Sequence, residues 1–375
     1  MIDTVVFRLK SDQYTIKDMS VFDGVSYKKG KNFVSKAYYC KSYPNQQKKN
    51  GSYFPMISIL NSKGGHQDPK SVLEIQVSLP KLMYGTNFFE VDKPDINIIY
   101  QKLLSILNQL GIETSIDQLK LVIVKRADFS KMIILPEYLG KADYVINKLL
   151  RFNYKPKAEF SCKEFRGKQE GVYLKFYNKA QGYVIYDKIG EILNNGYTSI
   201  EKKLIKQYKD GEIKNNVLRF ELSFHRKDSF DAFVNKRISS DKKRDFLLQD
   251  IFNKKLAKNI LLDAFDKVFG QVAIGLITLS EMEDNKLRDY LENSGMGMSK
   301  QIKLYYWARM TTTNGVNGAW EHLRSKYNGN SITRVRKEIA LALQELGNMS
   351  GNVPNLIAFL RKEHENFEII KPKRA

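Results

Sequence analysis

VYLKFYNKAQGYVIY, residues Val172–Tyr186, is the stretch with the clearest fold signal in the chain. Two runs of β-branched, aromatic and other apolar residues, Val172–Tyr177 and Tyr183–Tyr186, flank a short polar segment, Asn178–Gly182. Strand-forming runs on both sides of a segment with Asn and Gly are typical of a β-hairpin. We therefore expect two antiparallel strands here.

Further strand and helix patterns lie on both sides of this hairpin. Strands are expected at Met1–Lys10, Ser71–Leu79, Leu119–Phe129 and Asn216–His225, and loops around short strands over Lys28–Lys70. Helices are expected where Pro94 and Asp95 open an apolar period that ends at Gly111, over Pro136–Phe152, and over Ile200–Lys209. This order predicts an α+β domain with a mainly antiparallel sheet and helices packed on one face.

The pattern becomes helical from about Phe246 onward. Helices are expected at Lys254–Phe269, Leu279–Asn293, Ser299–Met310, Val316–Tyr327, Thr333–Leu346 and Val353–Phe367. Breaks rich in Gly, Asn and Ser separate them. Since the length also favours more than one domain, we predict an α+β domain over residues 1–245 and a helical region over residues 246–375.

The chain carries a large positive charge. It has 62 Lys or Arg residues against 41 Asp or Glu, which gives a formal net charge of +21. Such an excess indicates a polyanionic partner. Nucleic acid is favoured over a membrane surface, because the basic residues are spread along the chain among 21 Tyr and 21 Phe that could stack on bases. The alternative is a basic protein whose charge only solvates its surface.

Two cysteines, Cys40 and Cys162, belong to no CxxC or Cys/His cluster, so neither a disulfide framework nor a zinc site is supported. The reducing cytoplasm is the expected compartment. The apolar run near Val272–Leu279 is far shorter than the roughly 20 residues that span a bilayer. The N-terminus has no basic region followed by an apolar stretch, so we expect no signal peptide and no membrane partner.

Ionisable residues interrupt several expected strands. Arg126 and Asp128 end one strand, Arg219 and Glu221 share a face of another, and Glu74 lies in a third. Carboxylates that project from neighbouring strands would offer the oxygen ligands that magnesium or manganese prefers, and such a cation could polarise a scissile phosphate. The alternative is structural ion pairing of Arg126 with Asp128 and of Arg219 with Glu221.

A fourth interruption lies where the hairpin gives way to a helical pattern after Tyr186. A tyrosine is a poor nucleophile at its free pKa near 10, so a catalytic one needs a metal, a cation or a base nearby. Lys188 follows two residues after Tyr186, and an extended strand end would place it on the same side. Most tyrosines are packing residues, and the pattern alone does not select Tyr186.

Five short motifs follow one another along the chain. They are Met1-Ile2-Asp3 with its strand ending Phe7-Arg8-Leu9, Glu74-Ile75 leading through Ser78, Pro80 and Lys81 to Gly85-Thr86-Asn87-Phe88-Phe89, Arg126-Ala127-Asp128, Tyr186 to Ile192, and Leu218-Arg219-Phe220-Glu221. In their order and spacing the chain resembles the gene II replication initiators of filamentous phages and the related phage X replication proteins. The family's Tyr-x-Lys-x-x-Glu-Leu motif is matched with Ile192 in place of Leu. The resemblance covers nearly the whole chain.

The resemblance implies that Tyr186 is a nucleophile that nicks DNA. Many rolling-circle nucleases hold their cation with a His-hydrophobe-His pair, which this sequence lacks: His66, His225, His322 and His364 are isolated. We therefore expect carboxylates to hold Mg²⁺ or Mn²⁺. The candidates are Glu74, Asp128 and Glu221, with Glu191 as a fourth, and each has the alternative of a salt bridge or surface position.

The helical region contains a candidate DNA-reading element. Asn330 and Ser331 could cap a helix whose first turns carry Arg334, Arg336 and Lys337. The alternative is a basic, solvated helix. Among the strand residues, Arg126 and Arg219 are the candidate DNA contacts.

The resemblance implies a metal-dependent reaction in which Tyr186 attacks one strand of a replication origin. It would leave a 5′-phosphotyrosine and a 3′-hydroxyl that a host polymerase extends, and the same site could reseal the strand. Origin DNA in double- and single-stranded form, a host helicase and a host DNA polymerase would be the partners. The helicase is implied because the sequence has no GxxxxGK[ST] phosphate-binding loop.

Two other functions use parts of the same pattern. A replication protein could bind the origin and recruit host enzymes without cutting. A tyrosine recombinase also uses a tyrosine, but it needs its Arg and His/Lys cluster before that residue, whereas His322 and Arg324 follow Tyr186. Nicking of supercoiled origin DNA with covalent attachment separates these readings.

Overall fold

A computed structural model describes residues 1–29, 34–61, 71–151, 161–166, 172–214, 216–235, 245–269, 276, 279–326, 329–349 and 356–372. Its main feature is one ten-stranded sheet in the order β3-β4-β5-β6-β1-β8-β12-β11-β10-β9, in which all neighbouring strands are antiparallel. The fold class predicted from the sequence, α+β with an antiparallel sheet followed by helices, is confirmed.

The strands of this sheet are β1 (Ile2–Lys10), β3 (Gly24–Lys29), β4 (Val34–Tyr39), β5 (Met56–Asn61), β6 (Val72–Ser78), β8 (Ile123–Ile134), β9 (Ser161–Arg166), β10 (Val172–Tyr177), β11 (Gln181–Asp187) and β12 (Val217–Phe224). A separate small pair joins β2 (Thr15–Ile16) to β7 (Ile112–Glu113). In the centre, β1 lies between β6 and β8 although β6 and β8 are far from it in sequence. The middle of the sheet therefore depends on long-range pairing.

The predicted hairpin is present as β10 and β11. The side-chain oxygen of Asn178 accepts hydrogen bonds from the backbone N–H groups of Ala180 (2.8 Å) and Gln181 (2.9 Å). This Asx-type closure explains why the chain reverses here. The register then places Tyr173 opposite Tyr186.

Strand β8 begins later and ends later than the pattern indicates. Ser115 and Gln118 form a capping box that starts the short helix α4 (Ile116–Lys120), so the first residues of the expected strand are helical. At the other end the strand continues through the polar Ser130 and Lys131, both buried. The Lys131 ammonium lies 3.6 Å from the buried Glu90 carboxylate. This ion pair offsets part of the free-energy cost of burying the Lys131 charge.

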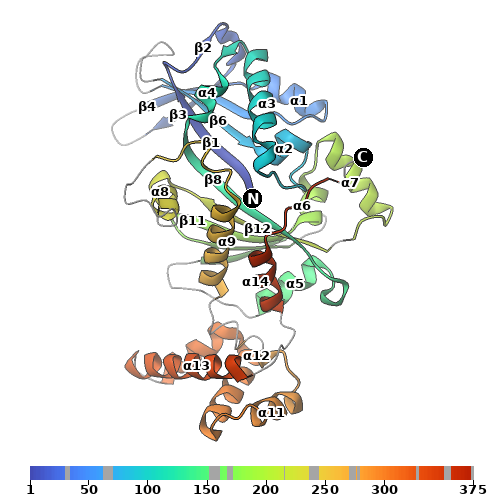
Figure 1. The fold of residues 1–375 in the computed structure, drawn as a ribbon, viewed down its shortest axis with the longest axis vertical. Coiled ribbons are helices and arrows are strands. Elements are labelled where there is room, and N and C mark those ends of the chain that lie inside the picture. The colour runs from blue at the N-terminus through green and yellow to red at the C-terminus, as the bar shows by residue number, and fades with distance from the viewer. Residues whose placement is uncertain are drawn as a thin grey trace.

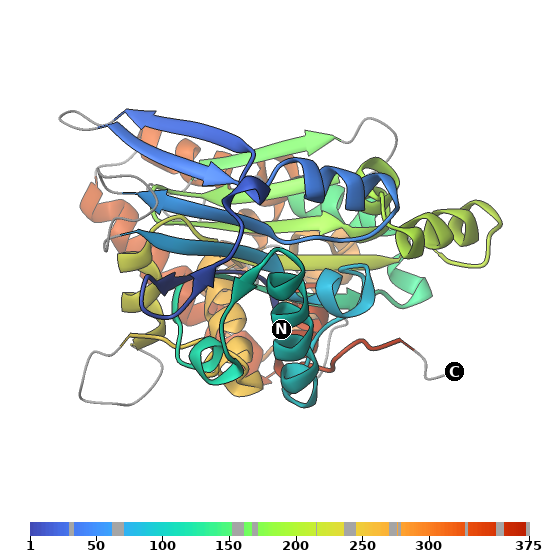
Figure 2. The same cartoon turned by 90° about the horizontal axis from the view of Figure 1, so that it is seen from above.

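Helices cover one face of the sheet, as predicted. They include α3 (Ile96–Gln109), α5 (Ala142–Arg151), α8 (Lys227–Asn235), α9 (Lys254–Phe269) and α14 (Leu356–Asn366). On this face Phe220 of β12 packs against Phe265 of α9 and against the buried His364 of α14. Figure 2 shows the sheet curling away from α9, with the β3–β4 hairpin and β9 rising on the opposite side.

The remaining helices lie at the ends of strands or in the C-terminal region. They are α1 (Ser42–Lys49), α2 (Leu79–Tyr84), α6 (Lys188–Asn195), α7 (Ser199–Lys209), α11 (Asp284–Glu292), α12 (Met298–Lys326) and α13 (Gly329–Met349), and η1 (Met19–Val21), η2 (Lys93–Asp95) and η3 (Glu137–Leu139) are short 3-10 turns. The sequence predicts two helices where α12 lies, and they join at a kink where Gly315 has φ 69°.

The region after residue 245 has two environments. Helices α9 and α14 pack against the sheet, whereas α11, α12 and α13 project from it as a group (Figure 1). Within that group the rings of Trp307 and Trp320 stack with centroids 5.2 Å apart. Among the described residues no helix is long and apolar enough to cross a membrane.

Candidate active site

Polar side chains gather on the sheet face opposite the helices, where β1, β8, β12 and β11 lie side by side. The period of two along a strand separates the faces. In β12, Phe220 points to the helices, while Arg219 and Glu221 point to the other face. In β11, Tyr183 packs against Phe220, while Tyr186 contacts Glu221. The two tyrosines therefore lie on opposite faces, as their spacing predicts.

Tyr186 sits at the centre of this face and is only 6% exposed. Its hydroxyl donates a 3.2 Å hydrogen bond to Oε2 of Glu221. Its ring stacks on that of Tyr173, with centroids 5.4 Å apart and planes 17° apart. Burial raises the pKa of Tyr186 well above its ordinary value, while the positive charge of Arg219 acts in the opposite direction. The phenol is thus neutral in the free protein, and its hydroxyl is already hydrogen-bonded to the carboxylate of Glu221.

Arg219 lies directly opposite Tyr186 in the β11–β12 pair and is 1% exposed. Its guanidinium contacts Oδ2 of Asp3 at 3.0 Å and donates to Ser130 Oγ at 3.1 Å. A further donor reaches the backbone carbonyl of Asn87, and Nε lies 3.7 Å from Oε2 of Glu221. The ion pair between Arg219 and Glu221, which the sequence offers as an alternative to a DNA contact, is therefore present. Arg219 uses its donors inside the protein.

Two carboxylates, Asp3 and Glu221, contact this arginine, and a third, Asp128, interacts electrostatically with both of them. Burial and the charge of Glu221 raise the pKa of Asp128 to about 8, and burial and the charge of Asp3 raise the pKa of Glu221. Burial alone would raise the pKa of Asp3 as well, but the Arg219 guanidinium lowers it. One arginine thus satisfies Asp3 and leaves Asp128 and Glu221 repelling each other.

This carboxylate cluster, Asp3, Asp128 and Glu221, is chemically suited to a hard cation. Oδ1 of Asp128 is buried and accepts no hydrogen bond from the described part of the chain, although Nε of Arg126 lies 3.7 Å from it, so the ion pair between Arg126 and Asp128 that the sequence offers as an alternative is present. Mg²⁺ and Mn²⁺ prefer such oxygens. Within the described ranges, however, no three Asp, Glu, His or Cys residues lie close enough to form a ligand set as they stand.

Lys188 is the first residue of α6 rather than the continuation of an extended strand. The side chain of Asp187 caps this helix by accepting from the Gly190 N–H at 3.0 Å, so the expected strand-end geometry is wrong. Lys188 is nevertheless beside Tyr186, with its ammonium 6.0 Å from the ring centroid. It donates to Oδ1 of Asn87 at 2.6 Å and to Oε2 of Glu191 at 2.5 Å.

This lysine is fully buried, and burial lowers its pKa. Glu191, a candidate metal ligand from the sequence, is paired with it. Burial alone would raise the pKa of Glu191, but the Lys188 ammonium lowers it.

Two other predicted residues lie at the margin of the site. Glu74 is in β6 as expected, but it pairs with Arg8 at 2.7 Å. Asp3 contacts Ser78, at the other end of β6. Ser78 is four residues from Glu74, which corresponds to about 13 Å along the strand at a rise of about 3.3 Å per residue. The structure does not bring Glu74 to Asp128 and Glu221. Arg126 is 37% exposed in its side chain, with Nε 3.7 Å from Asp128.

The candidate DNA-reading residues are in α13, outside this site. The helix begins at Gly329, so Asn330 and Ser331 lie within it rather than capping it. Arg334 is 78% exposed and Lys337 is exposed, while the guanidinium of Arg336 lies 4.8 Å from the ring centroid of Trp320. Arg334 and Lys337 are therefore accessible to a partner.

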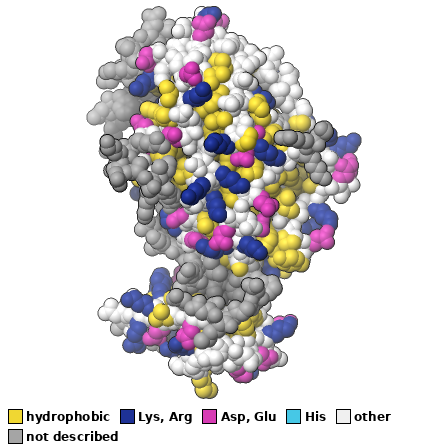
Figure 3. All heavy atoms as spheres, viewed as in Figure 1, with side chains coloured by type: hydrophobic (Ala, Val, Ile, Leu, Met, Phe, Trp, Pro, Cys, Tyr) yellow, Lys and Arg dark blue, Asp and Glu magenta, His cyan; other side chains and the backbone are white. Residues whose placement is uncertain are grey.

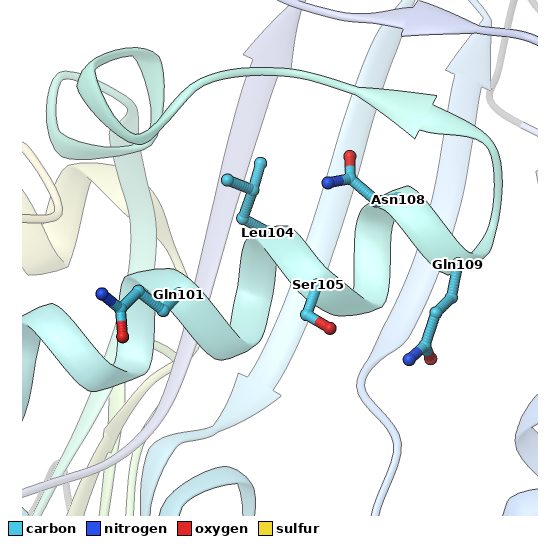
Figure 4. A pocket seen from close by; sticks show the side chains of 5 residues that line it. All are labelled: Gln101, Leu104, Ser105, Asn108 and Gln109. Atoms are coloured by element: carbon cyan, nitrogen blue, oxygen red, sulfur yellow. The ribbon is translucent and has the colours of Figure 1, made fainter.

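Neither of two surface hollows coincides with the carboxylate cluster. One lies along α3 and is lined by Gln101, Leu104, Ser105, Asn108 and Gln109 (Figure 4). The other lies between α1 and the start of α7. Basic side chains also occur on the helix-bearing side of the molecule, where Figure 3 shows Lys and Arg side chains near the middle of the face. Positive charge alone therefore does not locate the site.

A family model for the N-terminal region of the phage replication-associated protein encoded by gene II matches residues 1–238. The chain belongs to this phage replication family. The matched residues include the strands that carry Asp3, Asp128, Tyr186 and Glu221, so the buried polar face is part of the family's domain. The comparisons with curated proteins and with solved structures found no match.

Several residues of this site in the gene II family domain were not selected from the sequence. Asp3 belongs to the opening motif of the resemblance, and an acidic residue inside an alternating strand is a usable signal. Asn87 belongs to the motif that ends Phe88-Phe89, but only the structure shows that it contacts both Lys188 and Arg219. Tyr173 becomes a neighbour of Tyr186 only through the hairpin register, and no local pattern could have identified it.

Replacing Asp128 with Asn should stabilise the protein in metal-free buffer at pH 8 and change little near pH 4. Its pKa is raised to about 8, so the folded state retains a proton that the unfolded chain releases from about pH 4 upward. Wild type therefore loses stability through this window, by at most about 1.4 kcal/mol per pH unit, and Asp128→Asn does not. Urea unfolding at several pH values measures the difference.

Glu74→Gln is the matched control, because it removes a carboxylate from the same sheet face but outside the cluster. A stability difference between Asp128→Asn and wild type that stays constant or shrinks from pH 4 to pH 8 would contradict the raised pKa of Asp128.

Proposed function

We propose that this phage replication protein nicks and rejoins one strand of origin DNA through a 5′-phosphotyrosine, and so starts rolling-circle replication. The observation that carries the proposal is the hydrogen bond from the Tyr186 hydroxyl to Glu221, beside the buried Arg219, whose Nε lies 3.7 Å from Glu221. A nucleophile, a base and a fixed positive charge lie within one group of contacts. This is the arrangement that activation of a phenol needs.

The reaction exchanges one phosphodiester for another. Glu221 accepts the phenolic proton of Tyr186 as the phenolic oxygen forms a bond to phosphorus. The bond from phosphorus to the 3′ oxygen breaks, and that oxygen leaves as a 3′-hydroxyl after it takes a proton from water, to which Glu221 returns the proton that it accepted from Tyr186. Burial and Asp3 raise the pKa of Glu221, which makes it a better proton acceptor than an ordinary glutamate. The reverse reaction reseals the strand without ATP.

Positive charge beside Tyr186 supports this step. Arg219 stabilises negative charge on the phenolic oxygen, which offsets part of the effect of burial. Lys188 is held 6.0 Å from the ring by Asn87 and Glu191. Groups fixed in advance by the fold stabilise a charged transition state without rearranging. We infer that Lys188 positions the scissile phosphate and that Arg219 stabilises the phenolate.

Asp128 and Glu221, with Asp3 beside them, are the residues that we propose to hold Mg²⁺ or Mn²⁺. The proposal rests on the raised pKa of Asp128 and on its oxygen that lacks a hydrogen-bond donor within the described residues. The bound ion would polarise the scissile phosphate as a Lewis acid. Glu191 and Glu74 are paired with Lys188 and Arg8 and are weaker candidates.

Origin DNA is the proposed substrate, bound as a duplex and cut as a single strand. We assign duplex contacts to Arg334 and Lys337 of α13, which are exposed on the projecting helical group. Host helicase and host DNA polymerase would unwind the nicked duplex and extend the 3′-hydroxyl, in the host cytoplasm. We assign Arg126, at the exposed margin of the carboxylate cluster, to a phosphate near the cut.

Tyr186→Phe should bind origin DNA but form no covalent adduct, because the change removes one oxygen and keeps the ring stacked on Tyr173. Tyr183→Phe is the control, since Tyr183 lies on the opposite face and should leave nicking intact. The measurement is a denaturing gel with an end-labelled origin strand and Mg²⁺. An adduct formed by Tyr186→Phe, or protein attached to the 3′ end, would show that the nucleophile or the chemistry is misassigned.

Mn²⁺ should stabilise the wild-type protein at pH 8 and should not stabilise the double variant Asp128→Asn/Glu221→Gln. A ligand at 100 times its Kd adds about 2.7 kcal/mol to the stability of the folded state. Thermal unfolding with increasing Mn²⁺ measures this independently of nicking, and the double variant should also lose nicking while it still binds the origin. Equal stabilisation of both proteins would place the ion elsewhere.

Replacing Arg334, Arg336 and Lys337 together with Ala should weaken binding to duplex origin and spare cleavage of a short single strand that contains the nick site. The expected loss is tenfold or more, since each phosphate contact contributes to a steep salt dependence. Arg336→Ala alone separates loss of its packing on Trp320 from loss of DNA contact. If the triple variant loses duplex binding and single-strand cleavage to the same extent, its three residues do not act in duplex binding alone.

A further inference from the structure

A basic hollow lies between the end of α1 and the turn that joins α6 to α7. It is lined by Asn45, Lys48, Lys49, Gly196, Tyr197 and Lys202. Its three lysines are exposed. Within the described part of the chain none of these three has a carboxylate partner, so the hollow carries uncompensated positive charge. Charge without internal partners is available to a ligand.

Tyr197 forms the centre of this hollow. The ammonium groups of Lys48 and Lys81 lie 5.1 and 5.0 Å from its ring centroid. Lys81 is also paired with the buried Glu201 at 2.9 Å, so its charge is used inside the protein. The hollow therefore combines lysines that lack carboxylate partners with a half-buried aromatic ring. Lysines beside an aromatic ring are the combination by which proteins bind single-stranded nucleic acid.

The two walls of the hollow are held together by backbone contacts. The N–H of Ser199 donates to the carbonyl of Gly51 at 2.9 Å, which joins the end of α1 to the start of α7. Gly51 has φ +73°, and a Cβ there would lie 2.6 Å from the Ser199 hydroxyl, so only glycine fits this approach. Glu201 accepts from the Tyr197 N–H at 3.0 Å. The hollow is thus formed before any ligand arrives.

Helix α6 connects the hollow to the candidate active site. Lys188 beside Tyr186 is its first residue, and Gly196 of the hollow follows its last. Eight residues at about 1.5 Å each give a separation of about 12 Å along the helix. At the rise of about 3.4 Å per nucleotide of a stacked, helical strand, this corresponds to about three to four nucleotides. A strand whose scissile phosphate lies at Tyr186 can therefore reach the hollow.

We propose that this hollow binds phosphates of the single strand three to four nucleotides from the scissile bond. The distance in nucleotides between the hollow and the scissile bond rests on the proposed nicking function. The DNA binding that the inference predicts is independent of catalysis. Lys48, Lys49 and Lys202 contact the phosphates, and Tyr197 provides a surface for a base or sugar. The hollow would hold the strand in line with Tyr186 while the bond is cut and resealed.

The test measures binding of a fluorescein-labelled 20-nucleotide oligothymidylate to full-length protein in the Tyr186→Phe background, without divalent metal, from about 50 to 200 mM KCl. The triple variant Lys48→Ala/Lys49→Ala/Lys202→Ala should bind at least tenfold more weakly. The slope of the logarithm of the binding constant against the logarithm of the salt concentration should become less steep by about 2. Each of the three lost phosphate contacts on a single strand contributes about 0.7 to this slope. The Lys→Arg triple variant should bind nearly as well as the parent.

The matched control removes three lysines from α9, Lys254, Lys255 and Lys258, on the helix-bearing side of the sheet. It changes the net charge equally and should leave affinity and slope within twofold of the parent. The proposal is overturned if the two alanine variants behave alike, or if the parent does not bind the oligothymidylate at the lowest salt. A selective loss in the binding assay, together with a wild-type protein that forms no adduct with origin DNA and Mg²⁺, would retain the hollow as a DNA site and reject the nicking function.

Discussion

The buried guanidinium of Arg219 is the interaction on which the rest of the site depends. It joins β12 to β1 through Asp3, to β8 through Ser130, and to the loop after α2 through the Asn87 carbonyl. Removing one partner of a buried ion pair costs about 3–5 kcal/mol because the other charge is left uncompensated. The same charge that holds these strands together lies opposite Tyr186 in the β11–β12 pair. The packing of the site and the chemistry that we propose for it therefore depend on one side chain.

The positive charges of Arg219, Arg126 and Lys188 do not offset the burial of every carboxylate in this cluster, and this gives the site its character. Asp3 is satisfied by the arginine, whereas the pKa of Asp128 rises to about 8 and that of Glu221 rises too. A fold that only required stability would avoid such repulsion or replace it with apolar contacts. The raised pKa values of Asp128 and Glu221 are what the proposed cation binding and proton transfer would require. Perturbed carboxylates are common where catalysis occurs.

The two faces of the sheet divide these tasks. On one face, Phe220 packs against Phe265 and His364, and burial between these rings lowers the pKa of His364 to about 4. That face anchors α9 and α14 and contributes apolar burial. On the other face, the neighbours of Phe220 in the same strand are Arg219 and Glu221. Because residues alternate along a strand, a rigid apolar layer directly supports the polar one.

The sequence by itself determined the hairpin, the antiparallel α+β class, the opposite faces of Tyr183 and Tyr186, and the family resemblance that singles out Tyr186. These follow from local patterns: the period of two, the turn at Asn178 and short motifs. Only the tertiary structure decided that Asp3, rather than Glu74, joins Asp128 and Glu221, that Arg219 faces inward, and that Lys188 begins a helix capped by Asp187. A local pattern fixes which face a residue occupies, but register and strand order between distant segments fix which residues on that face become neighbours.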